Sequence, residues 1–171
     1  MLMALIFIAA DLQPSSQYAP GLHSPGQSDS VAVLKWHDLE YGQEQAASHE
    51  NVVLVFFEAE WCGICRRLER EVFADLVVQQ RIEENYVPVM IDVDSKKQVL
   101  FNGETYSVRE FAQSMQVSAV PTLLFVSSDG EVMAHHTGFV TTDRMTVLLD
   151  FIISKEFGTY SFDEYLKLMD G

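Results

Sequence analysis

The sequence predicts an α/β fold, because short apolar runs of strand length alternate with longer segments of helical periodicity. Residues 52–57 form a β-branched and aromatic run that is typical of a buried strand. The segment after it carries apolar residues on one helical face, at Leu68, Val72, Phe73 and Leu76. With 171 residues, 48% of them hydrophobic, the chain is long enough for one domain with a real core.

The only two cysteines of the chain, Cys62 and Cys65, lie where this strand turns into the helix. The first helical turn has unpaired N–H groups and the positive end of the helix dipole, so we expect a depressed pKa for Cys62. One turn brings Cys65 back beside Cys62, within reach of a disulfide. In such a pair the outer sulfur attacks and the inner sulfur resolves the mixed disulfide.

Two alternatives to a redox pair are a structural disulfide and half of a zinc site. Zinc would need two more ligands, for which His135 and His136 are the only adjacent candidates. Neighbours on a strand point to opposite faces, so we favour the redox pair and expect no metal and no cofactor beyond the Cys62–Cys65 disulfide.

The chain begins with an apolar segment at 1–10, too short to span a bilayer, and a Pro-, Ser- and Gly-rich linker at 11–30. We favour a secretory signal for the first segment, although it lacks a basic n-region; the alternative is an apolar segment packed on the domain. Residues 1–30 are therefore predicted as signal and linker, 31–155 as the domain, and 156–171 as a helical extension.

Within the domain, residues 31–34 suggest a first strand or an apolar anchor, and Asp38 is a candidate N-cap for a helix over 39–48. The strand at 52–57 is followed by one long predicted helix from Cys62 to about Asn85. Alternating apolar residues then predict a strand over 86–93.

The segment 94–107 contains Asn102-Gly103, a turn signal, and is predicted as a small hairpin or a lid beside the site, or as a surface loop without a chemical role. Ser107 and Glu110 have the spacing of a capping box for a helix over 108–115.

The last part of the domain has a strand at 123–126, a turn at Asp129-Gly130 and an edge strand at 131–136. A helix capped by Thr141 or Thr142 should run to about residue 154. A short helix at 161–169 could dock through Phe162, Tyr165 and Leu166, which gives the predicted C-terminal helical extension.

Two distant motifs in order, Trp61-Cys62-Gly63-Ile64-Cys65 after a strand and Val120-Pro121-Thr122 before another, resemble the thioredoxin superfamily over about residues 31–155. The resemblance implies a thioredoxin-like fold, with a central mixed β-sheet flanked by helices. Two features, the insertion at 94–107 and the ending Phe162-Asp163-Glu164-Tyr165-Leu166, make the chain look most like the exported, SoxW-like thioredoxin-related proteins.

In the resembled family the proline that matches Pro121 is cis and faces the cysteines, and the residue before it, here Val120, offers its backbone to a substrate strand. Gly138 matches a glycine that the family places near the site for close approach. The resemblance thus implies that substrate is bound at Trp61, Gly63, Ile64, Val120, Pro121 and Gly138.

The chain departs from cytoplasmic thioredoxins, whose buried Asp and Lys align here with Phe56 and Met90. Glu58 is the nearest replacement acid and is predicted to accept and release the proton of Cys65. The alternative is that Glu58 is a solvated carboxylate at the end of the strand. For Glu60 we favour this second interpretation. Ile64 replaces a proline, and without a histidine between the cysteines we expect a reducing potential.

The net charge of −14 argues against nucleic acid and anionic membranes as partners. The predicted function is a monomeric thiol–disulfide oxidoreductase, periplasmic or otherwise exported, that reduces protein disulfides and is itself reduced by a membrane thiol transporter. The alternative is a binding or holding module on the same scaffold, with a structural cysteine pair.

Overall fold

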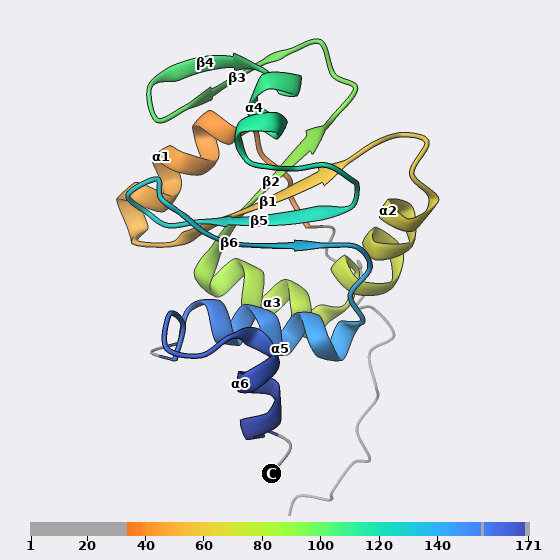
Figure 1. The fold of residues 1–171 in the computed structure, drawn as a ribbon, viewed down its shortest axis with the longest axis vertical. Helices are drawn as coiled ribbons and strands as arrows, with labels where there is room; N and C mark the ends of the chain where they lie inside the picture. Colours follow the sequence, from red (N-terminus) through yellow and green to blue (C-terminus); the bar gives the residue numbers. More distant parts are fainter. Residues whose placement is uncertain (1–33, 155, 170–171) are drawn as a thin grey trace, which may run out of the picture. The chain divides into compact units, whose positions relative to one another are not determined.

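The computed structural model describes residues 34–154 and 156–169, built on a four-stranded mixed sheet (Figure 1). The strand order is β2 (Tyr86–Asp92), β1 (Val52–Glu58), β5 (Thr122–Val126) and β6 (Val132–Thr137). β1 pairs in parallel with β2 and antiparallel with β5, while β6 is antiparallel to β5. The predicted α/β class, the mixed sheet and the edge position of β6 are confirmed.

Helices cover both faces of this sheet, because β1 is apolar on both of its sides. Figure 1 shows α1 (Leu39–His49) and α4 (Val108–Ser114) on one face, and α3 (Leu76–Asn85) and α5 (Thr142–Ile152) on the other. Val53, Val55 and Phe57 pack in the first core, whereas Leu54 and Phe56 pack in the second. Both cysteines belong to the second core.

The single long helix predicted from Cys62 to Asn85 is wrong, because the helical segment breaks in the middle. α2 (Gly63–Leu68) continues into one π-helical stretch, η1 (Glu69–Phe73), and ends there. Asp75 starts α3 by accepting hydrogen bonds from the N–H groups of Val77 at 2.9 Å and Val78 at 3.2 Å. Leu76 therefore falls in a new first turn and is 66% exposed, not buried as the periodicity indicated.

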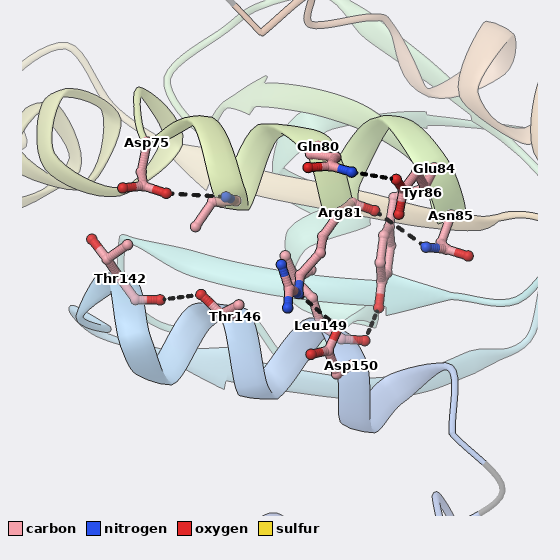
Figure 2. Close-up of polar contacts among 11 residues, drawn as sticks. Asp75, Gln80, Arg81, Glu84, Asn85, Tyr86, Thr142, Thr146, Leu149 and Asp150 are labelled. Atoms are coloured by element: carbon pink, nitrogen blue, oxygen red, sulfur yellow. Dashed lines mark hydrogen bonds and ion pairs between the residues drawn. The ribbon is translucent and has the colours of Figure 1, made fainter.

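Polar contacts join α3, the start of β2 and α5 (Figure 2). Arg81 forms an ion pair with Asp150 at 2.8 Å, and the Tyr86 hydroxyl donates to the Leu149 carbonyl at 2.5 Å. Burial, together with the nearby Asp150 charge, raises the pKa of Tyr86 far above its usual range. These contacts fix the second core beneath the cysteine-bearing helix.

Residues 94–107, the insertion, contain a hairpin of β3 (Gln98–Phe101) and β4 (Glu104–Ser107), which was one of the alternatives left open by the sequence. Its turn residue Asn102 exchanges hydrogen bonds with Gln43 of α1, at 2.7 and 3.2 Å, and donates to the Gly130 carbonyl at 3.0 Å. Those partners hold the hairpin tip against α1 and the β5–β6 turn. The predicted capping box is confirmed, since Ser107 and Glu110 cap α4 reciprocally.

Asp38 is the N-cap of α1, as predicted, and accepts a hydrogen bond from the Tyr41 N–H at 2.9 Å. Just before it, His37 forms a single bridge to Val89 of β2. The predicted strand at 31–34 and the predicted signal and linker lie outside the described residues, except that Leu34 is buried and is not in a strand. The described helices include none with the length and apolarity that crossing a membrane requires.

The C-terminal extension contains α6 (Phe162–Met169), close to the predicted helix. It docks through aromatic contacts, since the rings of Phe162 and Tyr165 lie 5.7 and 4.9 Å from the Phe151 ring of α5. Before α5, Thr141 occupies the N-cap position, but its side chain makes no capping hydrogen bond.

Candidate functional site

The two cysteines form a disulfide at the start of α2, with their Cα atoms 5.2 Å apart. Cys62 is the N-cap of α2, and its Sγ accepts a hydrogen bond from the backbone N–H of Cys65 at 3.1 Å. α2 and η1 follow each other without a gap, so the pair stands at the N-terminus of a helical stretch that ends at Phe73. The geometry fits the predicted order of a capping outer sulfur and an inner sulfur one turn later.

The two cysteines are both buried, whereas the side chains next to them are large, apolar and exposed. Cys62 is 5% exposed and Cys65 is fully buried. The flanking Trp61 and Ile64 are, by contrast, 68% and 53% exposed. Gly63 is also exposed, and a Cβ placed there would meet only the end of the Arg66 side chain, at 3.9 Å. The exposed rim is thus built of large apolar side chains around a sheltered disulfide.

The second predicted motif lies next to this rim. The peptide bond between Val120 and Pro121 is cis, and Val120 packs against the core cluster that contains both cysteines. The Pro121 carbonyl accepts a hydrogen bond from the Gly138 N–H at 2.8 Å. Gly138 has φ +101°, a backbone conformation that favours glycine, and nothing within 4 Å of a Cβ built there. The structure therefore brings Gly138 beside Pro121 with open space over it.

A cavity of about 360 Å³ opens between Trp61 and the cis-proline loop. Its lining includes Val120, Ala119 and Val117 of the loop, and Ala112 and Arg109 of α4. Such an apolar cleft beside an exposed loop backbone has the form of a peptide-binding groove.

The orientation of Trp61 is fixed by a residue that the sequence analysis did not single out. Its indole Nε1 donates to Asp94 Oδ2 at 2.6 Å. Asp94 follows the end of β2, the strand parallel to β1, and the carboxyl ends of parallel strands meet at the same edge of a sheet. Because both predicted strands end at this edge of the sheet, the acids at the end of the second strand, Asp92 and Asp94, could have been predicted to lie near the cysteines.

The core beneath the cysteines is apolar at the two positions that align with the buried Asp and Lys of cytoplasmic thioredoxins. Phe56 is fully buried and is the register partner of Met90 on β2, so the two substituted positions are neighbours. The Trp36 ring packs 5.6 Å from Phe56 and 4.9 Å from Phe73 of η1. Aromatic packing thus fills this space, and the nearest acid must come from elsewhere.

Glu58 lies two residues beyond Phe56 on β1, so its side chain falls on the face of the sheet that packs against the cysteines. Burial, first of all, raises the pKa of Glu58, and the charges of Asp92, Glu69 and Glu60 raise it further, while Arg66 opposes them. Glu69 and Arg66 belong to the helical segment that carries Cys65. Glu58 is therefore a half-buried acid beside that segment.

The two arginines after the cysteines, Arg66 and Arg67, are exposed. Arg66 donates to the Glu60 carbonyl. Arg67 pairs with Glu71 at 2.8 Å and lies over the Phe139 ring, 4.3 Å from its centroid.

The zinc alternative finds no support in this geometry. Both cysteine sulfurs are bonded to each other, and zinc requires thiolates. Among the described residues there is no group of three or more His, Cys, Asp or Glu side chains arranged to hold a metal ion.

Comparison with known proteins gives a family match over most of this domain. Residues 39–153 match the family model of the thioredoxin-like domain. The chain is 28% identical over 125 residues to the thiol:disulfide interchange protein DsbD of Actinobacillus pleuropneumoniae, covering 71% of this chain and 20% of that protein. The chain thus spans about one fifth of the length of this curated relative.

Solved structures show the same fold at lower identity. A thioredoxin-fold protein from Helicobacter pylori superposes with a TM-score of 0.61 at 18% identity, over 71% of this chain and 80% of that one. The C-terminal domain of Neisseria meningitidis DsbD in its oxidised form gives a TM-score of 0.51 at 17% identity, over 66% of this chain and 90% of that one.

Proposed function

Because this chain belongs to the thioredoxin-like domain family, we propose that it is a thiol–disulfide oxidoreductase whose Cys62 and Cys65 alternate between a dithiol and a disulfide. One observation carries the proposal: Cys62 caps a helix with its sulfur, which accepts the Cys65 N–H, while Cys65 is fully buried. A hydrogen bond and a helix N-terminus both stabilise a thiolate at Cys62.

In the reductive direction the Cys62 thiolate attacks one sulfur of a substrate disulfide. The substrate S–S bond breaks, a mixed disulfide forms, and the leaving thiolate takes a proton from water. Cys65 then loses its proton and attacks Cys62 Sγ, which releases the second substrate thiolate. The substrate gains two electrons, and the enzyme is left with the Cys62–Cys65 disulfide of this structure.

The acceptor for the Cys65 proton is Glu58. Its place on the cysteine-facing side of β1 supports this role, and so does its raised pKa, because a stronger base takes a thiol proton more readily. In the part of the chain that the structure describes, the position of the buried aspartate is filled by the apolar side chains of Phe56 and its neighbour Met90.

The substrate is an extended protein segment that carries a disulfide. It pairs with the backbone of Val120 and lies across the open face of Gly138, while its side chains contact Trp61, Ile64 and the cleft toward α4. Gly63 leaves room for the substrate sulfur to approach Cys62, and Pro121 shapes the loop.

The oxidised enzyme needs a dithiol donor, and a membrane thiol transporter supplies those electrons. The relatives named thiol:disulfide interchange protein support a place in such a chain of dithiol exchange. The apolar start of the sequence supports an exported, periplasmic protein. The monomeric state and the closer likeness to SoxW-like proteins are parts of the same proposal.

Reduction of insulin disulfides tests this function. The reduced protein, with dithiothreitol as the electron source, should precipitate insulin faster than dithiothreitol alone, and Cys62→Ser should not. Equal rates for wild type and Cys62→Ser would refute the oxidoreductase and leave a binding or holding module with a structural disulfide.

A further inference from the structure

A second cleft, of about 480 Å³, opens at the carboxyl ends of β1 and β2 and has no part in substrate binding as proposed above. Its apolar wall includes Trp36, Met90 and Val99. Two carboxylates, Glu58 and Asp92, line the same cleft.

These two carboxylates are held together by the sheet. Glu58 and Asp92 are Cα register partners on neighbouring parallel strands, and each is the last residue of its strand. Side chains of register partners point to the same face of a sheet. The negative charge of Asp92 therefore acts on Glu58 and raises the pKa of that carboxyl group.

The two carboxyl groups differ in their hydrogen-bond partners. Asp92 Oδ1 accepts a hydrogen bond from the Asp94 N–H at 3.0 Å. Among the described residues, no hydrogen bond reaches the Glu58 carboxyl group, which burial disfavours as an anion. Glu58 is therefore a stronger base than a fully exposed carboxylate, and it ends the strand that leads to the cysteines.

Other charges around Glu58 come from each neighbouring element. Glu60 lies in the loop after β1 and Glu69 on η1, and both add negative charge, whereas Arg66 of α2 opposes them. Further along the cleft, its lining also includes His37, Asp38 and Lys97. Of the charges that act on Glu58, that of Asp92 is the strongest.

We propose that Asp92 is a positioning residue: its charge makes Glu58 the acceptor for the Cys65 proton, and the cleft releases that proton to water. The inference rests on the proposed function. In the resolving step the Cys65 S–H bond breaks and its proton binds Glu58, while the new Cys65 thiolate displaces the substrate sulfur from Cys62. Glu58 then passes the proton to water in the cleft, and no further reactant is needed.

The test removes the charge of Asp92 without removing its hydrogen-bond acceptor, in Asp92→Asn. Glu60→Gln is the matched control, because it also deletes one carboxylate beside Glu58, but one that acts on it less strongly. Asp92→Glu keeps the charge and serves as the rescue variant. In each reduced protein, the titration of the Glu58 side-chain carboxyl carbon is followed by NMR, and the release of a preformed mixed disulfide is timed against pH.

In Asp92→Asn the midpoint of the Glu58 NMR titration should fall by on the order of one pH unit. The pH below which mixed-disulfide release slows should fall with it. Glu60→Gln should shift both by less, and Asp92→Glu should resemble wild type. Equal shifts in Asp92→Asn and Glu60→Gln, or a Glu58 shift without a moved rate limb, would overturn the proposal. Failure of wild type to reduce insulin is a separate result, and it would refute the proposed function instead.

Discussion

Trp61 is the most exposed aromatic side chain at the site, yet its indole Nε1 is bound to Asp94 Oδ2 at 2.6 Å. The bond links the residue directly before Cys62 to the end of β2. A large apolar ring that would otherwise turn freely in water is thus held as a wall of the cleft beside Val120. Ordering the ring before substrate arrives lowers the entropy that binding must offset.

Asp94→Ala should therefore weaken substrate binding more than it slows the chemical steps. We expect KM for a peptide disulfide to rise by about 3- to 10-fold with kcat nearly unchanged, because a hydrogen bond to a charged group is lost. Asp94→Asn retains a hydrogen-bond acceptor, so its KM should lie between those of wild type and Asp94→Ala. An unchanged KM, with the Trp61 indole N–H signal shifted in the NMR spectrum, would show that ordering this ring does not contribute to binding.

Glu58→Gln should slow the resolving step, on the order of 100-fold, because the amide cannot accept the Cys65 proton. In wild type the rate should fall as pH drops through the raised pKa of Glu58, since the protonated acid is no base. The variant should lack this acid limb. Stopped-flow measurement of mixed-disulfide release from pH 5 to 9 checks both effects, and overlapping profiles would reduce Glu58 to a strand-end carboxylate.

Phe56 and Met90 are neighbouring apolar residues at the positions where cytoplasmic thioredoxins carry a buried aspartate and lysine. Phe56→Asp would place a carboxylate among Trp36 and Phe73 without a partner, at a cost of about 3–5 kcal/mol of unfolding free energy. Urea unfolding measures that loss. Adding Met90→Lys should recover part of it, because the two positions are register partners. No loss in Phe56→Asp would mean that water reaches this part of the core.

His136 gives the fold a sensitivity to acid that is independent of the cysteines. It lines a cavity of about 330 Å³ between β6, α5 and the C-terminal segment, and its Nε2 is buried without a partner among the described residues. Burial, and then the charge of Arg144, lower the pKa of His136, while the Phe139 backbone opposes them.

A lowered pKa means that the fold disfavours the protonated ring. The stability that depends on neutral His136 is complete above its unfolded pKa, near 6.5, and is lost as pH falls through the lower folded value. His136→Gln should flatten this acid loss in unfolding measurements made as pH falls below about 6.5. The exposed neighbour His135→Gln is the control and should keep the wild-type slope. Parallel slopes for all three proteins would contradict the assignment.

Local signals in the sequence were sufficient for most of the fold. The capping box at Ser107 and Glu110, the turn at Asn102-Gly103 and the alternating strands each depend on short-range chemistry, and each occurs as predicted. The break after Phe73 was missed, because apolar periodicity continues through it. The signal was Asp75, whose carboxylate caps a new helix and whose effect on periodicity appears only at Leu76.

At the site, the spacing of Cys62 and Cys65 located the disulfide, and the resemblance to thioredoxins located the cis-proline. The supporting acids Asp92 and Asp94 were missed because their relevance depends on strand pairing, which sets Asp92 beside Glu58 and Asp94 beside Trp61. Chain spacing alone does not give that pairing. The parallel pairing of β1 with β2, with Glu58 opposite Asp92, places these acids at the site.

In the proposed mechanism Cys62, on the exposed side, attacks and buried Cys65 resolves, and trapping the intermediate tests this order most directly. Each single variant, Cys65→Ser and Cys62→Ser, is reacted with a peptide disulfide and analysed by mass spectrometry before and after added reductant. We expect Cys65→Ser to accumulate a covalent adduct at Cys62 that reductant removes, and Cys62→Ser to form none, because Cys65 has no exposed surface. Adducts on Cys62→Ser but not on Cys65→Ser would show that the roles are reversed and would contradict attack by Cys62.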